Sequence, residues 1–239
     1  MSTVEGAGVE LAYEESGAGA AIVLVHGMAA DRTVWHDVAP PAARTIAYDR
    51  RGYGGSGPPE PYDRTTVAEQ AEDLAALLHA INAAPATAVG ADFGALIVLD
   101  VLVRRARLLR GAVLVGPPVF QLVASALEPL SAERLALEEA LREGGRERGV
   151  EAWLEARGIA DPDRLAAARR DAGAFFADYG GQATLELARR DLRALDVPVV
   201  VVSSPRAPAH VRAAADAVLA LVPGARTADD VASALADLA

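Results

Sequence analysis

The stretch Gly90-Ala91-Asp92-Phe93-Gly94 decides how this chain folds, because it closes an apolar strand, opens a helix and places an acid between two glycines. Glycines on both sides of such a turn let neighbouring backbone approach closely, and the central residue is held in a strained conformation. This is the geometry of a nucleophile elbow. Asp92 is therefore predicted to stand at the carboxyl edge of a sheet, where a carboxylate can attack the carbon of a halide or an epoxide, or an acyl centre less readily.

Apolar runs of strand length alternate with helical patterns on both sides of this turn. The alternation predicts an α/β fold with a mostly parallel sheet and helices on both of its faces. The predicted strands carry β-branched or small apolar residues, as strands buried on both faces do, and span residues 21–25, 45–48, 86–89, 112–115 and 197–202. The helices predicted beside them span residues 66–83, 93–107, 208–221 and 231–238.

Between Phe120 and Leu195 the alternation stops, and the chain becomes charged and helical. The helices predicted in this block span residues 131–148, 150–156, 161–177 and 182–195. Pro follows Asp at the start of the third, as is common at the first helical position. The block interrupts the sheet pattern between two strands, so we expect a core of residues 1–119 and 196–239 and an inserted helical lid of residues 120–195.

Length and composition limit the classes of protein that fit. A chain of 239 residues can bury one sizeable core, and a net charge of −10 without a basic cluster argues against nucleic acid or an anionic membrane as partner. The absence of cysteine excludes disulfides and thiolate chemistry. No metal-ligand cluster, phosphate loop or dinucleotide fingerprint occurs, so we expect neither metal nor cofactor. The first sixteen residues lack the pattern of a signal peptide, which makes the cytoplasm the expected location.

Four segments in order resemble the α/β-hydrolase superfamily. They are Val-Leu-Val-His-Gly-Met at 23–28, the stretch 47–56, the elbow at 89–94 and Gly-Ala-Val-Leu-Val-Gly at 111–116. The second resembles the family's D-x-R-G-x-G-x-S turn. Together with the inserted helices, the resemblance covers nearly the whole chain, and it implies an α/β-hydrolase fold.

The resemblance also implies roles for particular residues. Asp92 matches the nucleophile position, and the backbone N–H groups of Met28 and Phe93 match the donors of the oxyanion hole. These donors are expected to favour the ionised form of Asp92. An aspartate elbow resembles haloalkane dehalogenases, fluoroacetate dehalogenases and epoxide hydrolases, whereas the sequence Arg-Thr-Val-Trp at 32–35 is more similar to the serine esterases and lactonases of the same superfamily.

The family's acid and histidine have no counterpart at their usual places. Ser203-Ser204-Pro205-Arg206 stands where the acid is expected after the predicted strand 197–202, and Gly116-Pro117-Pro118-Val119 fills the alternative place. Thr227-Ala228 passes almost directly into Asp229-Asp230, which leaves no room for a loop with the catalytic histidine. The sequence therefore predicts an incomplete triad.

The chain holds four histidines. His26 belongs to the oxyanion turn, where its usual role is structural, and His36 and His79 are expected to be surface or packed side chains. His210 begins a predicted helix at the same edge of the sheet as Asp92, and it is the candidate substitute base.

Five other side chains are candidates for substrate binding. The aromatic residues Trp153, Phe175, Phe176 and Tyr179 either line an apolar pocket over Asp92 or only pack the lid helices on the core. Arg206 either binds an anionic substrate or pairs with Asp92. For Asp92 itself the alternatives are a carboxylate that caps the following helix and a relic of a lost serine, while Asp49 is expected to fix its own turn through local hydrogen bonds.

The first functional hypothesis is a hydrolase of a small or medium apolar ester, epoxide or halide, with Asp92 as nucleophile. The second is a catalytically degenerate homologue that binds a ligand or a partner. The third is a lyase or isomerase that uses Asp92 as a general acid or base. In each case the ligand is a small apolar organic molecule, and the sequence leaves the oligomeric state open.

Overall fold

The sheet has eight strands, and the computed structural model describes them within residues 1–38, 43–59 and 61–238. Their spatial order is β1-β2-β4-β3-β5-β6-β7-β8. The strands β1 and β2 pair antiparallel with their neighbours, and β3 to β8 run parallel. The bounds are β1 (Ser2–Glu5), β2 (Glu10–Ser16), β3 (Ala20–Val25), β4 (Ala43–Tyr48), β5 (Ala86–Ala91), β6 (Leu109–Val115), β7 (Val199–Val202) and β8 (Arg226–Ala228).

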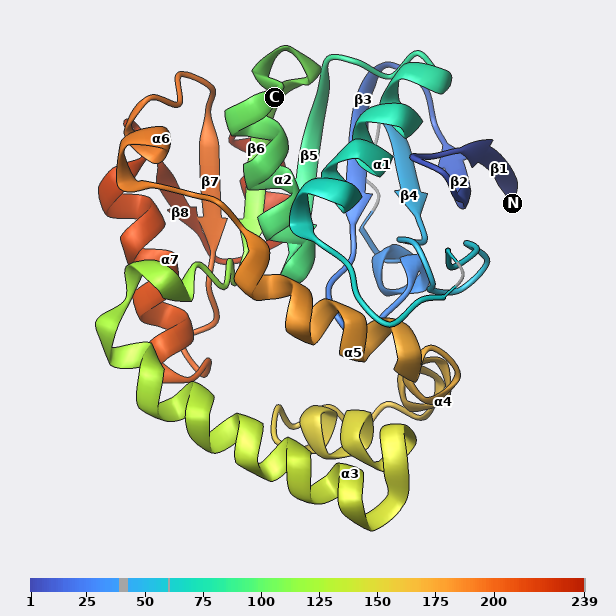
Figure 1. Ribbon diagram of the computed structural model, residues 1–239. Helices are drawn as coiled ribbons and strands as arrows, with labels where there is room; N and C mark the ends of the chain where they lie inside the picture. The colour runs from blue at the N-terminus through green and yellow to red at the C-terminus, as the bar shows by residue number, and fades with distance from the viewer. Residues whose placement is uncertain (39–42, 60, 239) are drawn as a thin grey trace.

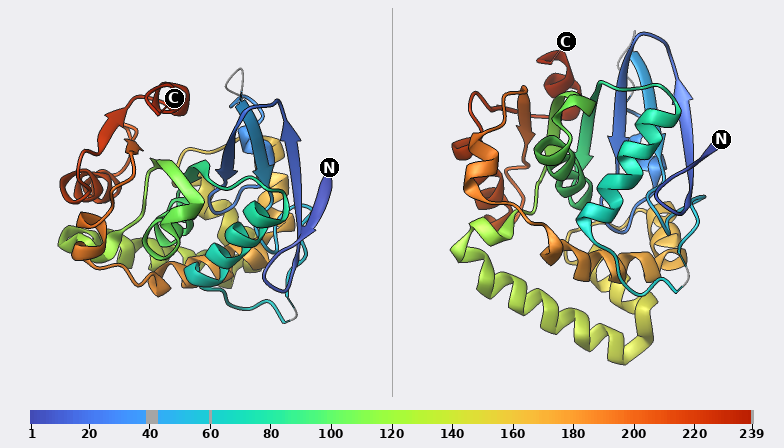
Figure 2. Two further views of the ribbon diagram at one scale, coloured as in Figure 1. Left: turned by 90° about the horizontal axis from the view of Figure 1, so that it is seen from above. Right: turned by 45° about the horizontal axis from the view of Figure 1, so that its top comes forward.

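Helices cover both faces of this sheet (Figures 1 and 2). Alternate residues of a strand point to opposite faces, so Val23 and Val25 pack into the larger core cluster while Ile22 and Leu24 pack into the smaller one. The larger cluster also holds side chains of α1 (Val67–Ala80), α2 (Phe93–Arg104) and α7 (Ala209–Leu221), and the smaller one holds side chains of α8 (Val231–Ala236). The predicted α/β-hydrolase architecture is confirmed.

The chain between β6 and β7 contains residues 120–195, which we call the inserted segment, and its helices lie across one end of the sheet (Figure 1). Its longest helix, α3, is interrupted by non-helical backbone at Gly144 and by a φ of 70° at Gly145, and the helix turns back there. The helices of this segment are α3 (Leu127–Glu155), α4 (Pro162–Arg170), α5 (Ala172–Gly181) and α6 (Arg189–Arg193), with short 3-10 turns at Phe120–Leu122, Ala124–Ala126 and Gln182–Thr184.

The structure differs from the predicted secondary structure in three respects. Residues 182–195 are not one helix, because the chain forms a short 3-10 turn at Gln182–Thr184 and starts α6 only at Arg189. Residues 161–177 are not one helix, because the chain leaves α4 at Arg170 and starts α5 at Ala172, and the side chain of Asp171 between them accepts a hydrogen bond from the Gly54 N–H group at 3.0 Å. The strands β1, β2 and β8 were not predicted. The last of these has three residues and is mostly exposed, so it lacks the apolar run that marks the other parallel strands.

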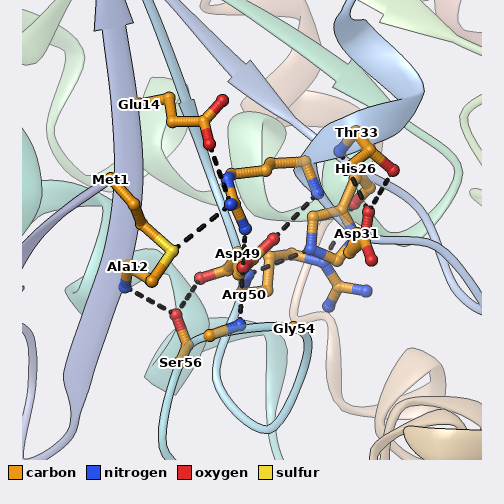
Figure 3. Close-up of polar contacts among 12 residues, drawn as sticks. Met1, Ala12, Glu14, His26, Asp31, Thr33, Asp49, Arg50, Gly54 and Ser56 are labelled. Carbon is orange, nitrogen blue, oxygen red and sulfur yellow. Dashed lines mark hydrogen bonds and ion pairs between the residues drawn. The ribbon is translucent and has the colours of Figure 1, made fainter. Parts of the chain in front are cut away.

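The turn that follows β4 is held by Asp49, as predicted (Figure 3). Its carboxylate accepts hydrogen bonds from the backbone of Arg32 at 2.9 Å and of Gly55 at 2.7 Å, and it forms an ion pair with the Arg32 guanidinium at 2.5 Å. The hydroxyl group of Ser56 donates to the Asp49 carbonyl and accepts from the Ala12 N–H group. The turn is thereby joined to β2.

A buried arginine in the same turn joins the inserted segment to the sheet. The Arg50 guanidinium donates to the carbonyl groups of His26 and Gly27, both at 2.9 Å, and forms an ion pair with Asp178 of α5 at 2.7 Å. Asp178 also accepts hydrogen bonds from Tyr53 and from Gln70, each at 2.7 Å. Every partner of this ion pair is buried, so its charges are balanced within the protein.

We expect Asp178→Asn to lower the free energy of unfolding by about 3–5 kcal/mol, because it leaves the buried Arg50 charge without its counter-ion. Urea titration at neutral pH measures the change. Glu143→Gln on the exposed surface of α3 serves as the control and should change stability by less than about 0.5 kcal/mol. Equal effects of the two substitutions would contradict this role of the ion pair.

Candidate active site

Asp92 occupies a strained turn between β5 and α2. Its backbone has φ 50° and ψ −121°, and α2 starts at the next residue, Phe93. A positive φ costs free energy in a residue other than glycine and persists only where the surrounding structure imposes it. The carboxylate does not cap the helix: its Oδ2 atom accepts a hydrogen bond from the Met28 N–H group at 3.1 Å instead. The interpretation of Asp92 as a helix cap is therefore wrong.

The topology of the sheet brings Asp92 and Met28 together. From β3 the chain adds β4 on one side and then crosses to add β5 on the other, so the strand order reverses between β3 and β5. In open parallel sheets ligands bind at such a switch point, outside the carboxyl ends of the strands. Here the two ends are Val25, which leads to the turn at 26–28, and Ala91, which leads to Asp92.

Glycines allow the close backbone contacts on which the turn depends. A Cβ atom at Gly90 would lie 2.5 Å from the Gly94 carbonyl oxygen, and one at Gly94 would collide with the Val25 carbonyl oxygen. A Cβ atom at Gly27 would lie 2.9 Å from the Asp92 Cβ atom. The glycine spacing in the sequence thus reflects a direct steric requirement.

Burial opposes the predicted ionisation of Asp92. Burial raises the pKa of the Asp92 carboxyl above its ordinary value, and the Arg157 cation and the N–H groups of Met28 and Phe93 lower it by less. The two donors act in the predicted direction. The cost of removing a carboxylate from water is larger than their effect, so the net shift favours the neutral form.

A cavity of about 530 Å³ lies over Asp92. Its floor comes from the turns at the sheet edge and its other walls from the inserted segment and the start of α7. Most of the lining is apolar. The residues are Gly27, Met28, Ala30, Val34, Trp35, Ala91, Asp92, Val115, Gly116, Pro118, Phe120, Glu133, Ala136, Leu137, Ala152, Trp153, Ala156, Arg157, Ile159, Arg164, Gln182, Pro208, His210 and Val211.

Some of the predicted binding residues reach this cavity and others do not. Trp153 lines it, whereas Phe175, Phe176 and Tyr179 do not. Phe175 is fully buried and packs edge-on against Trp153, with ring centroids 5.2 Å apart, so it supports the wall from behind. Phe176 packs on Phe175 in turn. The structure favours packing over substrate contact for these three aromatic residues.

Arg206 also lies outside the cavity and is exposed. It forms no ion pair with Asp92 among the residues that the structure describes, and its backbone N–H donates to the Ser204 hydroxyl at 3.2 Å. The turn after β7 therefore directs it toward solvent. The predicted roles of Arg206 as a partner of Asp92 or as an anion-binding residue in the site are wrong.

The four histidines differ in their surroundings. His26 is buried and its pKa is lowered by burial; its Nε2 atom accepts from the Arg50 N–H group and its Nδ1 atom bonds the Gly27 carbonyl, so both ring nitrogens are used. His36 and His79 are exposed. His210 lines the cavity beside the Phe120 ring, at a centroid distance of 5.4 Å, and burial lowers its pKa. It makes no hydrogen bond or ion pair with Asp92.

The sequence interpretation missed three charged residues in the cavity wall. Arg157 pairs with Glu133 at 2.6 Å and stacks over the Trp153 ring at 3.6 Å. Arg164 donates from Nε to the Ala29 carbonyl at 3.2 Å. In the sequence these residues stand among many other arginines and glutamates of the inserted segment, and no local pattern separates them from the solvated ones.

Residues 1–38, 43–59 and 61–238 offer neither a metal-binding cluster nor a membrane-spanning helix. No group of three or more His, Asp or Glu side chains is placed to hold a metal ion. Within the same part of the chain, no helix combines the length and the apolar character needed to cross a membrane.

A family model for the alpha/beta hydrolase fold matches residues 20–152, which include β3, the elbow and the first half of the inserted segment. The chain belongs to this family. Among solved structures, an alpha/beta hydrolase from Sphaerobacter thermophilus is similar over 99% of this chain and 98% of its own, with a TM-score of 0.74 and 25% identity. An enol-lactonase from Burkholderia xenovorans is similar over 99% of this chain and 94% of its own, with a TM-score of 0.73 and 19% identity.

The curated relatives match the chain over a shorter region. BpoC of Mycobacterium tuberculosis, whose name is that of a non-heme bromoperoxidase, is 32% identical over 113 residues, which are 45% of this chain and 42% of BpoC. An epoxide hydrolase from Caballeronia sordidicola is 36% identical over 92 residues, which are 37% of this chain and 28% of that protein. The chain thus spans less than half the length of either relative.

We expect Gly90→Ala to lower the free energy of unfolding by about 1–3 kcal/mol or more, because the added methyl group meets backbone that cannot rotate away. Gly180→Ala is a matched control. Gly180 lies inside α5 with nothing within 4 Å of its added Cβ, so the same change should raise stability by about 0.5–1 kcal/mol. Chemical denaturation of both variants checks the opposite signs. A small or positive effect at Gly90 would contradict the steric argument.

We expect Asp92→Asn to raise the melting temperature at neutral pH by a few degrees. An acid whose pKa is raised by folding binds more protons in the folded state, so its contribution to stability falls as pH rises from the ordinary value of 3.8 through the raised value. Asparagine stays neutral and tolerates the same backbone conformation. The melting temperatures of wild type and variant are measured at neutral pH and below pH 3.8. The variant should be more stable at neutral pH and equal to the wild type in acid; the same difference at both pH values would contradict the argument from the raised pKa.

Proposed function

We propose that this chain is a hydrolase in which Asp92 attacks a small or medium-sized epoxide, halide or ester. The observation that carries the proposal is the position of the Asp92 carboxylate. One oxygen, Oδ2, is held by the Met28 N–H group in a strained turn, and the side chain faces a largely apolar cavity of about 530 Å³. A cavity of this volume suits a small organic ligand.

The first step would form a covalent ester. An Asp92 oxygen bonds to the electrophilic carbon of the substrate, and the bond from that carbon to the halide or to the epoxide oxygen breaks with its electron pair. A halide leaves as its anion, and an opened epoxide oxygen takes a proton from water. Water then adds to the carbonyl carbon of the Asp92 ester and gives its proton to a base. The negative charge that develops on the carbonyl oxygen is stabilised by the N–H groups of Met28 and Phe93. When this intermediate collapses, the alkoxide leaves and takes the proton from the base, and the Asp92 carboxyl group loses its own proton to water and becomes a carboxylate again.

The geometry favours epoxides and halides over acyl esters. In ester hydrolysis by attack on a carbonyl, the substrate oxygen must occupy the oxyanion hole. Here Asp92 Oδ2 already accepts the Met28 N–H group. That arrangement suits attack on a saturated carbon. The oxyanion donors are then needed only in the second step, when the Asp92 ester is hydrolysed, and the oxygen that becomes negative there is the Asp92 oxygen that already accepts the Met28 N–H group.

His210 is the proposed base for the second step. It lines the same cavity, and burial lowers its pKa, which favours the neutral form that can accept a proton. Its lack of direct contact with Asp92 is compatible with action through a water molecule.

The proposal is tested by intact-protein mass spectrometry after incubation with a panel of alkyl halides and epoxides. We expect the wild type to gain the mass of the alkyl group from a halide or of the whole molecule from an epoxide, at Asp92 in a peptide map, and Asp92→Asn to gain nothing. Where product forms, its rate should fall by about a million-fold in this variant, as for loss of other nucleophiles. Asp163→Asn, a change of an exposed carboxylate, should leave adduct and rate unchanged.

The outcomes separate the candidate mechanisms. Product without adduct, lost in Asp92→Asn, would indicate general acid or base chemistry, which the raised pKa of Asp92 supports. Product that persists in Asp92→Asn would contradict the assigned role. Adduct that accumulates in the wild type but clears slowly would mean that the second step lacks an efficient base.

One observation favours a second candidate function, a homologue that binds a ligand without turnover. Both ring nitrogens of His26 are used, His36 and His79 are exposed, and His210 does not contact Asp92. Loss of a triad member can remove most of the rate enhancement. Saturable binding of panel compounds with neither adduct nor product would support this second function.

A further inference from the structure

Arg164 places a cation in the cavity wall without a direct anionic partner. It stands in the first turn of α4, and its Nε atom donates to the Ala29 carbonyl at 3.2 Å. Over residues 1–38, 43–59 and 61–238, its two terminal nitrogen atoms have no hydrogen-bond acceptor, and no carboxylate oxygen lies within 4.0 Å of its guanidinium. Neither terminal nitrogen is among the fully buried polar atoms without a partner in that part of the chain, so both keep some exposed surface.

The nearby carboxylates are all engaged elsewhere. Asp92 accepts the Met28 N–H group, and Asp161 accepts the backbone N–H group of Arg164 itself at 2.8 Å. Asp31 accepts from the Thr33 hydroxyl and from the side chain of Arg170. These three carboxylates attract the guanidinium, yet burial lowers the pKa of Arg164 by more than they raise it. The cation is therefore partly removed from water without a compensating contact.

The second arginine of the cavity shows the contrast. Arg157 forms an ion pair with Glu133 at 2.6 Å and lies over the Trp153 ring. Its charge is balanced within the inserted segment. Both terminal nitrogens of Arg157 donate to protein acceptors, whereas those of Arg164 have none among the described residues.

We propose that Arg164 binds a carboxylate group of the ligand, so that the substrate is an organic acid that carries the reactive epoxide, halide or ester elsewhere on its skeleton. The guanidinium presents two N–H groups in a planar fork that matches the two oxygens of a carboxylate. Its anchor, Ala29, directly follows Met28, so the charged end of the ligand lies on the same side of the cavity as the oxyanion donors. The inference rests on the proposed function for the placement of the ligand over Asp92.

Isothermal titration with phenylacetate and phenylacetamide tests the proposal, because the two probes differ only in the charge of the group that Arg164 would bind. We expect the wild type to bind the acid at least about tenfold more tightly than the amide. Arg164→Gln should make the two affinities about equal, with the affinity for the amide unchanged. Arg164→Lys should restore part of the preference, since it keeps the charge and loses the fork.

Arg169→Gln is the matched control, because Arg169 lies on the same helix and is half-exposed. It should keep the preference of the wild type. Equal affinities in the wild type, no binding of either probe at millimolar concentrations, or a preference that survives Arg164→Gln would each overturn the proposal. An equal loss of acid and amide binding in Arg164→Gln would also overturn it, because that result indicates a packing role.

Neither probe has a group that Asp92 could displace, so binding is measured without turnover. A preference for the acid that depends on Arg164 would support the carboxylate subsite even if no adduct forms at Asp92. In that case the hydrolase proposal would fail and the binding subsite would stand.

Discussion

The position of the site depends on the buried guanidinium of Arg50. A buried cation is tolerated only where its charge and its N–H groups are satisfied, so its partners are fixed together. Arg50 joins the carbonyl groups of the turn after β3 to Gln70 of α1 and to Asp178 of α5. Its guanidinium also lies 5.0 Å from the ring centre of Phe93, the residue after Asp92. One side chain thus sets the spacing between the oxyanion turn, the elbow and the inserted segment.

The sequence predicted the parts of the fold in which a local pattern carries the information. Strands buried on both faces, such as β5 and β6, are continuous apolar runs, and their residues identify them. The antiparallel strands β1 and β2 are partly exposed, with glutamates in both, so nothing in their composition separates them from loops. The break between α4 and α5 depends on a contact from Asp171 to Gly54, which is 117 residues away in the sequence.

The same distinction explains what could be predicted of the site. Asp92 and Met28 follow directly from apolar strands, and the order of the strands in a parallel sheet brings such positions to one edge. Glu133 and Arg164 come from helices, and Arg157 from the turn after α3; tertiary packing orients all three, so periodicity alone could not show which charged side chains face the cavity. Arg206 follows a strand as Asp92 does, but its turn at the β7 end places it in solvent. The position of a residue just after a strand therefore does not show whether its side chain enters the site, because the direction of the turn also decides this.

The inserted segment leaves the sheet after β6 and returns to its neighbour β7, so the roof of the cavity is one continuous stretch of chain. The break at Gly144 and Gly145 folds α3 back on itself, and the pair of Glu133 and Arg157 joins its first arm to the turn that follows its second arm. Substitutions in these arms can change the shape and polarity of the cavity without altering the register of any strand or the geometry at Asp92. Ligand preference can therefore diverge during evolution at a different rate from the turn that carries the chemistry.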